Sequence, residues 1–187
     1  LALQGRGRDD PTNTECTKMV SDSSGLLLSK RVVIPAGANG IGLAIARHFV
    51  EQGAIVCVCD LDGAAVATLS GSHEKLHGFQ VDVSDPSAVR GFFRSAEEVM
   101  GGLDILVNNA GIAGPTALCE DVDIEDWQRT INVDLNAQFY CAKYAIPMLK
   151  ASGGGSIVMM ASNAALFGFP MRSPYTAAKW ALIGLTK

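Results

Sequence analysis

A tyrosine and a lysine stand four residues apart in the segment SPYTAAKWALIGLTK, which contains Tyr175 and Lys179. On a helix the two side chains would share one face, and an ammonium beside a phenol favours the phenolate form. A phenol held in this way can give or take a proton near neutral pH, as a general acid or base does. Because Tyr-x-x-x-Lys also occurs by chance in surface helices, the pair alone leaves both interpretations open.

Three further polar signals lie after apolar runs or in a helical stretch upstream of this pair. Ser162 comes just after SIVMM, and its hydroxyl could hydrogen-bond a substrate carbonyl. The NNAG segment, 108–111, follows the run DILV, and Asn132 lies in a helical stretch, INVDLNAQF, that could turn inward. Since ligand-contacting groups lie at the carboxyl ends of parallel strands, these signals predict one site at one edge of a sheet. The asparagines of NNAG are equally well explained as braces between central strands.

A glycine-rich turn, PAGANGIG at 35–42, separates the first apolar run from a helical pattern. Closely spaced glycines let the backbone approach a pyrophosphate, and the helix N-terminus supplies unpaired N–H donors and a partial positive charge. A dinucleotide is therefore the predicted ligand, although any sharp strand-to-helix turn also uses glycine. The predicted ligand contacts in this turn are Gly37, Asn39, Gly40, Ile41 and Gly42.

Asp60 ends the second apolar run, about twenty residues after the glycine turn, where a carboxylate can accept hydrogen bonds from both ribose hydroxyls. The same negative charge would repel a 2′-phosphate, and the turn at 35–42 contains no Lys or Arg. NAD is therefore favoured over NADP. An aspartate just after a strand is also a common turn residue, so this second role remains open.

Short β-branched runs alternate with helical stretches from residue 31 onward, a pattern typical of a parallel sheet covered by helices on both faces. The expected strands are 31–34, 54–59, 76–81, 104–107 and 156–160; the expected helices are 41–53, a short one from Asp62, 86–100, 124–149 and one from Ser173. With right-handed crossovers, the natural topology is a doubly wound α/β sheet in three layers. Residues 1–29 are polar without a sustained period and are expected to form a poorly ordered leader, so that 30–187 form the domain.

The composition narrows the class of protein. A chain of 187 residues that is 48% hydrophobic supports one domain, and a net charge of −4 predicts neither a nucleic-acid nor a membrane partner. Five cysteines without disulfide or zinc spacing indicate a reducing, cytoplasmic setting and no metal site. Cys57 and Cys59 lie two apart in an apolar run and are expected to be small buried side chains on one face of a strand. No run predicts a membrane span, and no signal peptide is expected.

Seven of these features together resemble, in order and spacing, the motifs of the classical short-chain dehydrogenase/reductase family. They are the glycine turn, Asp60, Asp82-Val83, NNAG, Asn132, Ser162 and Tyr175-x-x-x-Lys179. The resemblance covers about residues 31–187 and implies a Rossmann-like NAD(P)-binding domain. It also implies an oxidoreductase that transfers a hydride between a nicotinamide cofactor and a secondary alcohol or ketone, without a metal.

The resemblance implies a role for each matching residue. Tyr175 would be the general acid for carbonyl reduction and the general base for alcohol oxidation, while Lys179 would favour its phenolate and hold the nicotinamide ribose. Ser162 would orient the reacting oxygen, and a backbone carbonyl at Asn132 would hold a water that links Lys179 to solvent. The other implied cofactor contacts are Asp60 and Leu61, Asp82 and Val83 at the adenine, and Asn109, Ala110 and Gly111 beneath the adenosine ribose.

Two departures from the family pattern bear on activity. Pro35 stands where threonine is usual and Ala36 where the first glycine is usual, so we expect either that Gly37 takes over the flexibility or that pyrophosphate binding weakens. The chain ends at Lys187 inside a helical pattern, and we expect the C-terminal strand or strands of the family to be missing. The alternative function is a catalytically silent dinucleotide-binding protein or an inactive truncated fragment. When full length, the protein is expected to form a homotetramer or homodimer.

Overall fold

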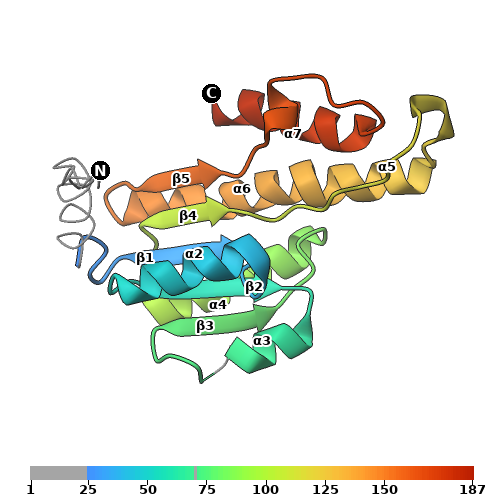
Figure 1. Cartoon of the computed structure of the whole chain (residues 1–187). Helices are drawn as coiled ribbons and strands as arrows, with labels where there is room; N and C mark the ends of the chain where they lie inside the picture. The colour runs from blue at the N-terminus through green and yellow to red at the C-terminus, as the bar shows by residue number, and fades with distance from the viewer. Residues whose placement is uncertain (1–24, 70) are drawn as a thin grey trace, which may run out of the picture.

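Five parallel strands form a single sheet in the computed structural model, which describes residues 25–69 and 71–187. The strands are β1 (Arg31–Pro35), β2 (Ile55–Asp60), β3 (Leu76–Gln80), β4 (Ile105–Asn108) and β5 (Ser156–Met159), in the order β3-β2-β1-β4-β5 (Figure 1). Every expected strand is present within one or two residues of its predicted ends. From β1 the chain adds β2 and then β3 on one side, and it then returns to add β4 and β5 on the other side of β1. This change of direction confirms the doubly wound α/β topology.

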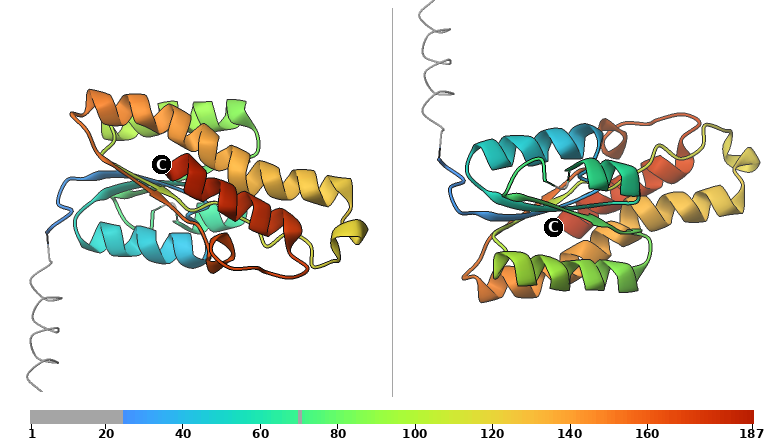
Figure 2. Two further views of the ribbon diagram at one scale, coloured as in Figure 1. Left: turned by 90° about the horizontal axis from the view of Figure 1, so that it is seen from above. Right: turned by 90° about the horizontal axis from the view of Figure 1, so that it is seen from below.

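Helices cover both faces of the sheet, which confirms the three layers. Figure 2 shows α2 (Gly40–Glu51) and α3 (Gly63–Leu69) on one face, and α4 (Pro86–Met100) and α6 (Ala137–Ala151) on the other. The helix α5 (Ile124–Ile131) continues into α6 through η2 (Asn132–Asn136), a turn of π-helix. Two short 3-10 turns, η1 (Cys119–Asp121) and η3 (Asn163–Ala165), precede α5 and α7 (Ser173–Thr186), and α7 lies beyond the β5 edge (Figure 1).

The central strands bury side chains on both faces, because helices pack on each side. Val33 and Cys57 pack with α4 and α6, whereas Val32 and Val56 pack with α2 and α3. Cys57 and Cys59 face the same core, as their spacing predicts. Burial raises the pKa of the Cys57 thiol to about 12, so this thiol stays neutral and packs as a small apolar group.

Residues 25–29 lie before the domain boundary expected from the sequence and have a defined conformation. Gly25–Ser29 belong to the segment expected to be a poorly ordered leader, yet they form a turn in which the Leu28 N–H donates to the Gly25 carbonyl at 3.0 Å. The Ser29 N–H donates to the Gly53 carbonyl at 3.1 Å and ties this turn to the connection between α2 and β2. The rest of that expectation, residues 1–24, lies outside the described residues. Within the described part of the chain, no helix is both long enough and apolar enough to cross a bilayer.

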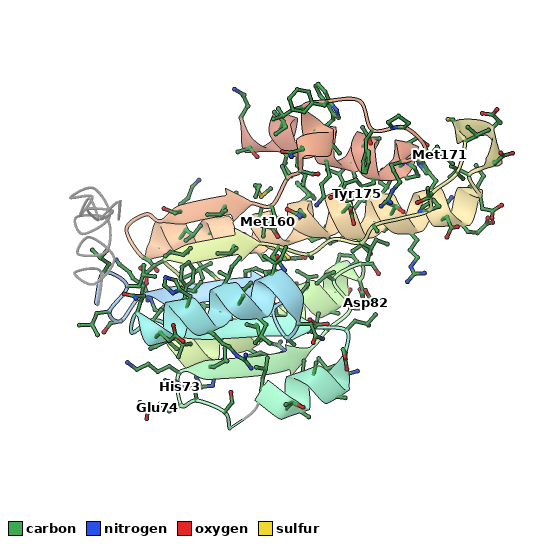
Figure 3. The ribbon with its side chains drawn as sticks, in the orientation of Figure 1. His73, Glu74, Asp82, Met160, Met171 and Tyr175 are labelled. Atoms are coloured by element: carbon green, nitrogen blue, oxygen red, sulfur yellow. The ribbon has the colours of Figure 1, made fainter. Side chains whose placement is uncertain are left out.

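The strand order places the site. At a topological switch point, the loops after the two diverging strands leave a crevice at the carboxyl edge of the sheet, where ligands bind. Here those loops begin at Ala36 after β1 and at Asn109 after β4. Figure 3 shows Asp82, Met160 and Tyr175 toward this edge, whereas His73 and Glu74 lie near the amino end of β3.

Candidate active site

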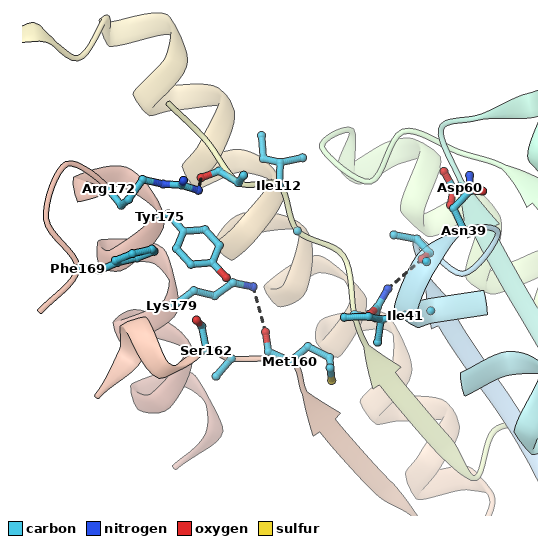
Figure 4. Close-up of a pocket in the computed structure, with 17 residues that line it drawn as sticks. Asn39, Ile41, Asp60, Ile112, Met160, Ser162, Phe169, Arg172, Tyr175 and Lys179 are labelled. Carbon is cyan, nitrogen blue, oxygen red and sulfur yellow. Dashed lines mark hydrogen bonds between the residues drawn. The ribbon is translucent and has the colours of Figure 1, made fainter. Parts of the chain in front are cut away.

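A cavity of about 560 Å³ opens at the carboxyl edge of the sheet. It brings together ten of the residues predicted from the sequence: Asn39, Gly40, Ile41, Gly42, Asp60, Asn109, Gly111, Ser162, Tyr175 and Lys179. Figure 4 shows Ser162, Tyr175 and Lys179 grouped at one end of this cavity, and Asn39, Ile41 and Asp60 at the other. One cavity therefore joins the glycine turn to Ser162, Tyr175 and Lys179.

A second cavity, of about 510 Å³, shares Ala36, Asp60, Gly111 and Ile112 with the first. Five further predicted residues line it: Leu61, Asp82, Val83, Ala110 and Asn132. The two cavities meet beside Asp60, so the predicted ribose contact lies between the predicted adenine contacts and the glycine turn. The two cavities together therefore bring most of the predicted cofactor contacts to one continuous region.

Lys179 is held inside the protein beside Tyr175 on α7. Its side chain is only 4% exposed, and its Nζ donates to the Met160 carbonyl at 3.0 Å. The Nζ lies 5.6 Å from the centre of the Tyr175 ring. Burial lowers the pKa of Lys179, and the nearby Asp134 carboxylate opposes that shift. The ammonium is thus buried in the cavity beside the ring of Tyr175.

Ser162 lines the cavity with a hydroxyl group that can still donate a hydrogen bond. It precedes η3, and its Oγ accepts a hydrogen bond from the Ala164 N–H at 3.1 Å. Because this bond uses an acceptor site of the hydroxyl, the O–H remains free to donate. A substrate carbonyl or hydroxyl oxygen in the cavity is a suitable acceptor.

The structure does not bring the Asn132 side chain to Lys179. Asn132 is exposed, its Oδ1 accepts from Asn136 Nδ2 at 2.8 Å, and its backbone carbonyl accepts from the Ala137 N–H across the π-helical turn. It lines the second cavity, whereas Lys179 lines the first. Its predicted role at the water relay therefore remains a proposal without a direct contact to support it.

Asp134, two residues further on, is the residue of this turn whose side chain lies near Lys179. It is fully buried, and its Oδ1 accepts from the Ile112 N–H at 2.6 Å. Among the described residues its Oδ2 has no hydrogen-bond partner. Burial raises the pKa of Asp134, while the Ile112 N–H and the Lys179 ammonium oppose the shift. The sequence offered one signal for this residue, because Asp134 is the acidic residue in the stretch INVDLNAQF. The pattern of strands and helices did not distinguish it as a site residue.

The conformation of the glycine turn differs from the expectation that Gly37 would supply the flexibility of the missing glycine. Ala36 itself adopts the left-handed conformation, with φ +53°, in place of the usual glycine. Gly37 does not take over this role, because its φ is not positive; it is needed for space, since a Cβ there would lie 2.7 Å from the Ile34 carbonyl oxygen and the Val58 side chain. Gly37 lines neither of the two cavities, so a direct ligand contact there has no support in the structure.

The asparagines of NNAG brace the site. Asn109 Nδ2 donates to the Ala36 carbonyl at 2.9 Å and to the Pro35 carbonyl at 3.3 Å, which ties the β4 loop to the glycine turn. Asn108 Nδ2 donates to the Gln138 carbonyl on α6 at 2.7 Å. Asn109 also lines the first cavity, so it combines the structural role with a position for ligand contact.

Asp60 also supports the backbone around it. One carboxylate oxygen accepts from the Ala38 N–H at 3.1 Å, and the other accepts from the Asp62 N–H at 3.2 Å. Each carboxylate oxygen has two lone pairs, so both retain the capacity to accept a ribose hydroxyl. Asp60 lines both cavities.

No cluster of three or more His, Cys, Asp or Glu side chains that could hold a metal ion occurs within residues 25–69 and 71–187.

We expect Ala36→Gly to raise the free energy of unfolding by about 0.5–1 kcal/mol, because the relief of left-handed strain exceeds the added entropy of the unfolded chain. Urea denaturation followed by circular dichroism measures the change. Gly42→Ala is the contrasting variant: its Cβ would lie 2.6 Å from Asn109 Nδ2, so it should destabilise the turn. A loss of stability in Ala36→Gly would contradict the assignment of strain to Ala36.

The fold and the site together define a class of protein. A doubly wound parallel sheet, a glycine turn at its switch point and a Ser, Tyr and Lys group in the same cavity are those of a Rossmann-like dinucleotide-binding protein. A sequence profile of the short-chain dehydrogenases matches residues 30–187. The chain belongs to the short-chain dehydrogenase family.

Individual relatives agree with this assignment. A 2-dehydro-3-deoxy-L-rhamnonate dehydrogenase (NAD(+)) from Sphingomonas sp. is 34% identical over 164 residues, which cover 88% of this chain and 66% of that protein. A 3beta-hydroxysteroid dehydrogenase from Mediterraneibacter gnavus is 35% identical over 162 residues, which cover 84% of this chain and 58% of that protein. The ligand-free structure of aldohexose dehydrogenase from Thermoplasma acidophilum is similar, with a TM-score of 0.78 and 31% identity over 87% of this chain and 60% of that one. The chain thus spans 58% to 66% of the length of these two curated relatives.

Proposed function

We propose that this chain is the cofactor-binding and catalytic part of a dehydrogenase that acts on secondary alcohols or ketones with NAD. One observation carries the proposal: Ser162, Tyr175 and Lys179 converge at one end of the cavity whose other end is the glycine turn. The acid, the cation and the hydrogen-bond donor therefore lie within reach of one bound substrate and one bound dinucleotide.

The residues present fit a nicotinamide dinucleotide. The backbone at Gly111 lies close to Lys179 and Asp134. A Cβ added at Gly111 would stand 3.1 Å from Lys179 Nζ and 3.6 Å from Asp134 Oδ1. The glycine turn would hold the pyrophosphate, Asp60 the adenosine ribose, and Asp82 with Val83 the adenine. Lys179 would also hold the nicotinamide ribose. When bound, the nicotinamide accepts or donates the hydride.

The chain's own residues supply position and protonation. In carbonyl reduction, Ser162 donates a hydrogen bond to the substrate oxygen and Tyr175 gives that oxygen its proton. Lys179 stabilises the phenolate that is left on Tyr175. In alcohol oxidation the same phenolate takes the hydroxyl proton, so one residue serves as acid in one direction and as base in the other.

The names of the relatives indicate a range of substrates. The Sphingomonas enzyme is named for a dehydrogenated sugar acid and for NAD, and the Mediterraneibacter enzyme is named for a steroid hydroxyl. Both proteins are named as dehydrogenases, and the name of the Mediterraneibacter enzyme specifies a hydroxyl group. We therefore assign a secondary alcohol or ketone as the substrate class of this chain.

The full-length protein is the material for the direct test. Titration with NADH, followed by the enhancement of cofactor fluorescence, measures binding, and absorbance at the nicotinamide band measures turnover with a panel of secondary alcohols and ketones. We expect saturable binding and NAD-dependent oxidation of at least one alcohol class. Binding without turnover would instead support the catalytically silent alternative, and the absence of binding would overturn the proposed function.

Asp60→Asn tests the preference for NAD. This variant keeps an acceptor oxygen for the Ala38 N–H but removes the charge that repels a 2′-phosphate, so we expect the ratio of kcat/KM for NAD over NADP to fall about tenfold. Arg129 from α5 also lines the second cavity, which makes direct measurement of both cofactors necessary. Asp121→Asn, in the exposed turn η1, is the matched control. An unchanged ratio in Asp60→Asn would leave Asp60 with its structural role alone.

A further inference from the structure

Arg172 is a charged residue of the active-site cavity that the proposed mechanism does not use. It directly precedes α7 and lines the cavity together with Ser162 and Tyr175. Figure 4 shows it beside Tyr175 and Phe169, at the end of the cavity away from Asn39 and Asp60. Its guanidinium therefore lies on the substrate side of the reacting residues, apart from the glycine turn.

The guanidinium is held in a defined orientation. Its Nη2 donates to the Ala113 carbonyl, and its Nη1 donates to Thr116 Oγ1 at 3.2 Å. Its Cζ lies 5.5 Å from the centre of the Phe169 ring and 5.6 Å from that of Tyr175. Two hydrogen bonds and two aromatic contacts reduce the freedom of the side chain before any ligand binds, so little entropy is lost on binding.

The charge and part of the hydrogen-bonding capacity of Arg172 are unmatched. The ion pairs found in the described part of the chain are Arg31–Asp104 and His48–Glu51, so no carboxylate there lies within ion-pair distance of Arg172. Its Nε is buried and, among the described residues, has no hydrogen-bond partner. The protein therefore leaves part of the donor capacity of this guanidinium unsatisfied, which is unfavourable for a buried polar group.

The charged side chains of the cavity are unevenly distributed. Its described cations, Lys179 and Arg172, lie at the Tyr175 end, whereas Asp60 lies at the other end. Lys179 already donates to the Met160 carbonyl and lies near the Asp134 carboxylate, and the proposed mechanism assigns it to Tyr175. Arg172 is then the cation that remains for the substrate itself.

We infer that Arg172 binds the carboxylate of the substrate, which makes the substrate a hydroxy acid in one direction and an oxo acid in the other. The inference rests on the proposed function and narrows its substrate class. A guanidinium presents N–H donors in the spacing of the two carboxylate oxygens, and such charge-assisted pairs are about twice as strong as neutral hydrogen bonds. The reacting oxygen would lie between Ser162 and Tyr175, with the carboxylate directed toward Arg172.

The competing explanation is a structural clamp. The bonds to Ala113 and Thr116 join the segment before α7 to the loop after β4, and this contact alone would give Arg172 a purpose. A clamp affects acidic and neutral ligands alike, because it acts on the shape of the cavity. A carboxylate-binding residue affects only ligands that carry the acid. The ratio between the two kinds of ligand separates the explanations.

The test measures binding, by isothermal calorimetry or ligand-observed NMR, to the full-length protein without cofactor at constant ionic strength. The probes are cyclohexanecarboxylate and its neutral counterpart cyclohexylmethanol. The variants are Arg172→Leu and Arg172→Lys, and Arg94→Leu on the exposed side of α4 is the control for loss of one surface charge. We expect the wild type to bind the carboxylate at least tenfold more tightly than the alcohol. Arg172→Leu should abolish this preference, Arg172→Lys should keep part of it, and Arg94→Leu should keep all of it.

Each other outcome has a definite meaning. The inference is overturned if the wild type shows no preference for the carboxylate, or if Arg172→Leu retains the preference. Inorganic phosphate that binds more tightly than the carboxylate, with the same dependence on Arg172, would overturn the assignment to a carboxylate. Because this measurement needs neither cofactor nor turnover, it stays separate from the proposed function: turnover of neutral alcohols without carboxylate binding would overturn only the inference, and carboxylate binding without turnover would overturn only the function.

Discussion

Tyr175→Phe is expected to lower kcat for both carbonyl reduction and alcohol oxidation by about 10²–10⁴-fold, the usual contribution of a positioned general acid or base. The change removes one oxygen and keeps the ring, so the contacts of the ring with Lys179 and Arg172 are retained. Binding of NADH should therefore change little. Steady-state kinetics in both directions, combined with a fluorescence titration of NADH, separates the loss of chemistry from any loss of cofactor binding.

Tyr140→Phe is the matched control for this loss. It likewise removes one phenolic hydroxyl, here from α6. The Tyr140 ring packs against the core between α4 and α6 and lies outside the active-site cavity. Its kcat should stay within about twofold of the wild type, in line with the small effect of most surface and rim substitutions. If Tyr175→Phe kept more than a tenth of the wild-type kcat, another group would have to be the acid, and the proposed mechanism would be wrong.

Lys179→Met is expected to lower kcat/KM by about 10²–10³-fold near neutral pH, because it removes the ammonium that favours the phenolate and the proposed contact to the nicotinamide ribose. Methionine is apolar and close in volume, so the buried position stays filled. The variant leaves the Asp134 carboxylate buried without its opposing charge, which should also reduce stability. Kinetics and urea denaturation of the same sample measure the two losses.

The double variant Lys179→Met with Asp134→Asn distinguishes the two effects. It removes both buried charges, so stability should recover while activity should not. Recovery of activity in the double variant would mean that Lys179 acts only by balancing Asp134, contrary to the proposed mechanism.

Asp134→Asn alone is the graded form of the same experiment. The asparagine oxygen can still accept from the Ile112 N–H, so the variant removes the charge and keeps the hydrogen bond. Since burial lowers the pKa of Lys179 and Asp134 opposes that shift, loss of the carboxylate lowers the pKa further. The ammonium is then lost at a lower pH as the pH rises, and the alkaline limb of the pH–activity profile should move toward neutral pH. An unmoved alkaline limb would show that the two charges are not coupled during turnover.

The elements of the fold were predictable because their signals are local. Alternating burial on two faces makes β1 and β2 continuous apolar runs, and α4 begins and ends as its sequence predicts. Asp85 caps it by accepting from the Ser87 N–H at 2.8 Å, Pro86 takes the first position, and Gly101 ends it with φ +70°. Such caps and turns act over a few residues, so they can be identified without knowing the rest of the chain.

The convergence of Ser162, Tyr175 and Lys179 in one cavity was predictable for a related reason. Ser162 follows a strand at the carboxyl edge, and Tyr175 and Lys179 share a face of α7, so their approach depends on strand order and helical spacing alone. The supporting residues were harder. A π-helical turn at Asn132–Asn136 changes which side chains face inward, and it brings Asp134, rather than the side chain of Asn132, beside Lys179. Helical spacing of 3.6 residues does not anticipate an inserted residue of this kind.

The sequence by itself determined the doubly wound topology, the three layers, the glycine turn and the Ser, Tyr and Lys group. Each of these depends on local patterns along the chain. Only the tertiary structure decided that Ala36 takes the left-handed conformation, that Asp134 is buried against the ammonium, and that Arg172 reaches the cavity without an acidic partner among the described residues. These three features depend on which distant segments meet: Asn109 on the turn, Ile112 on Asp134, and Ala113 with Thr116 on Arg172. Contacts between segments far apart in the chain are set by packing, and no local pattern carries them.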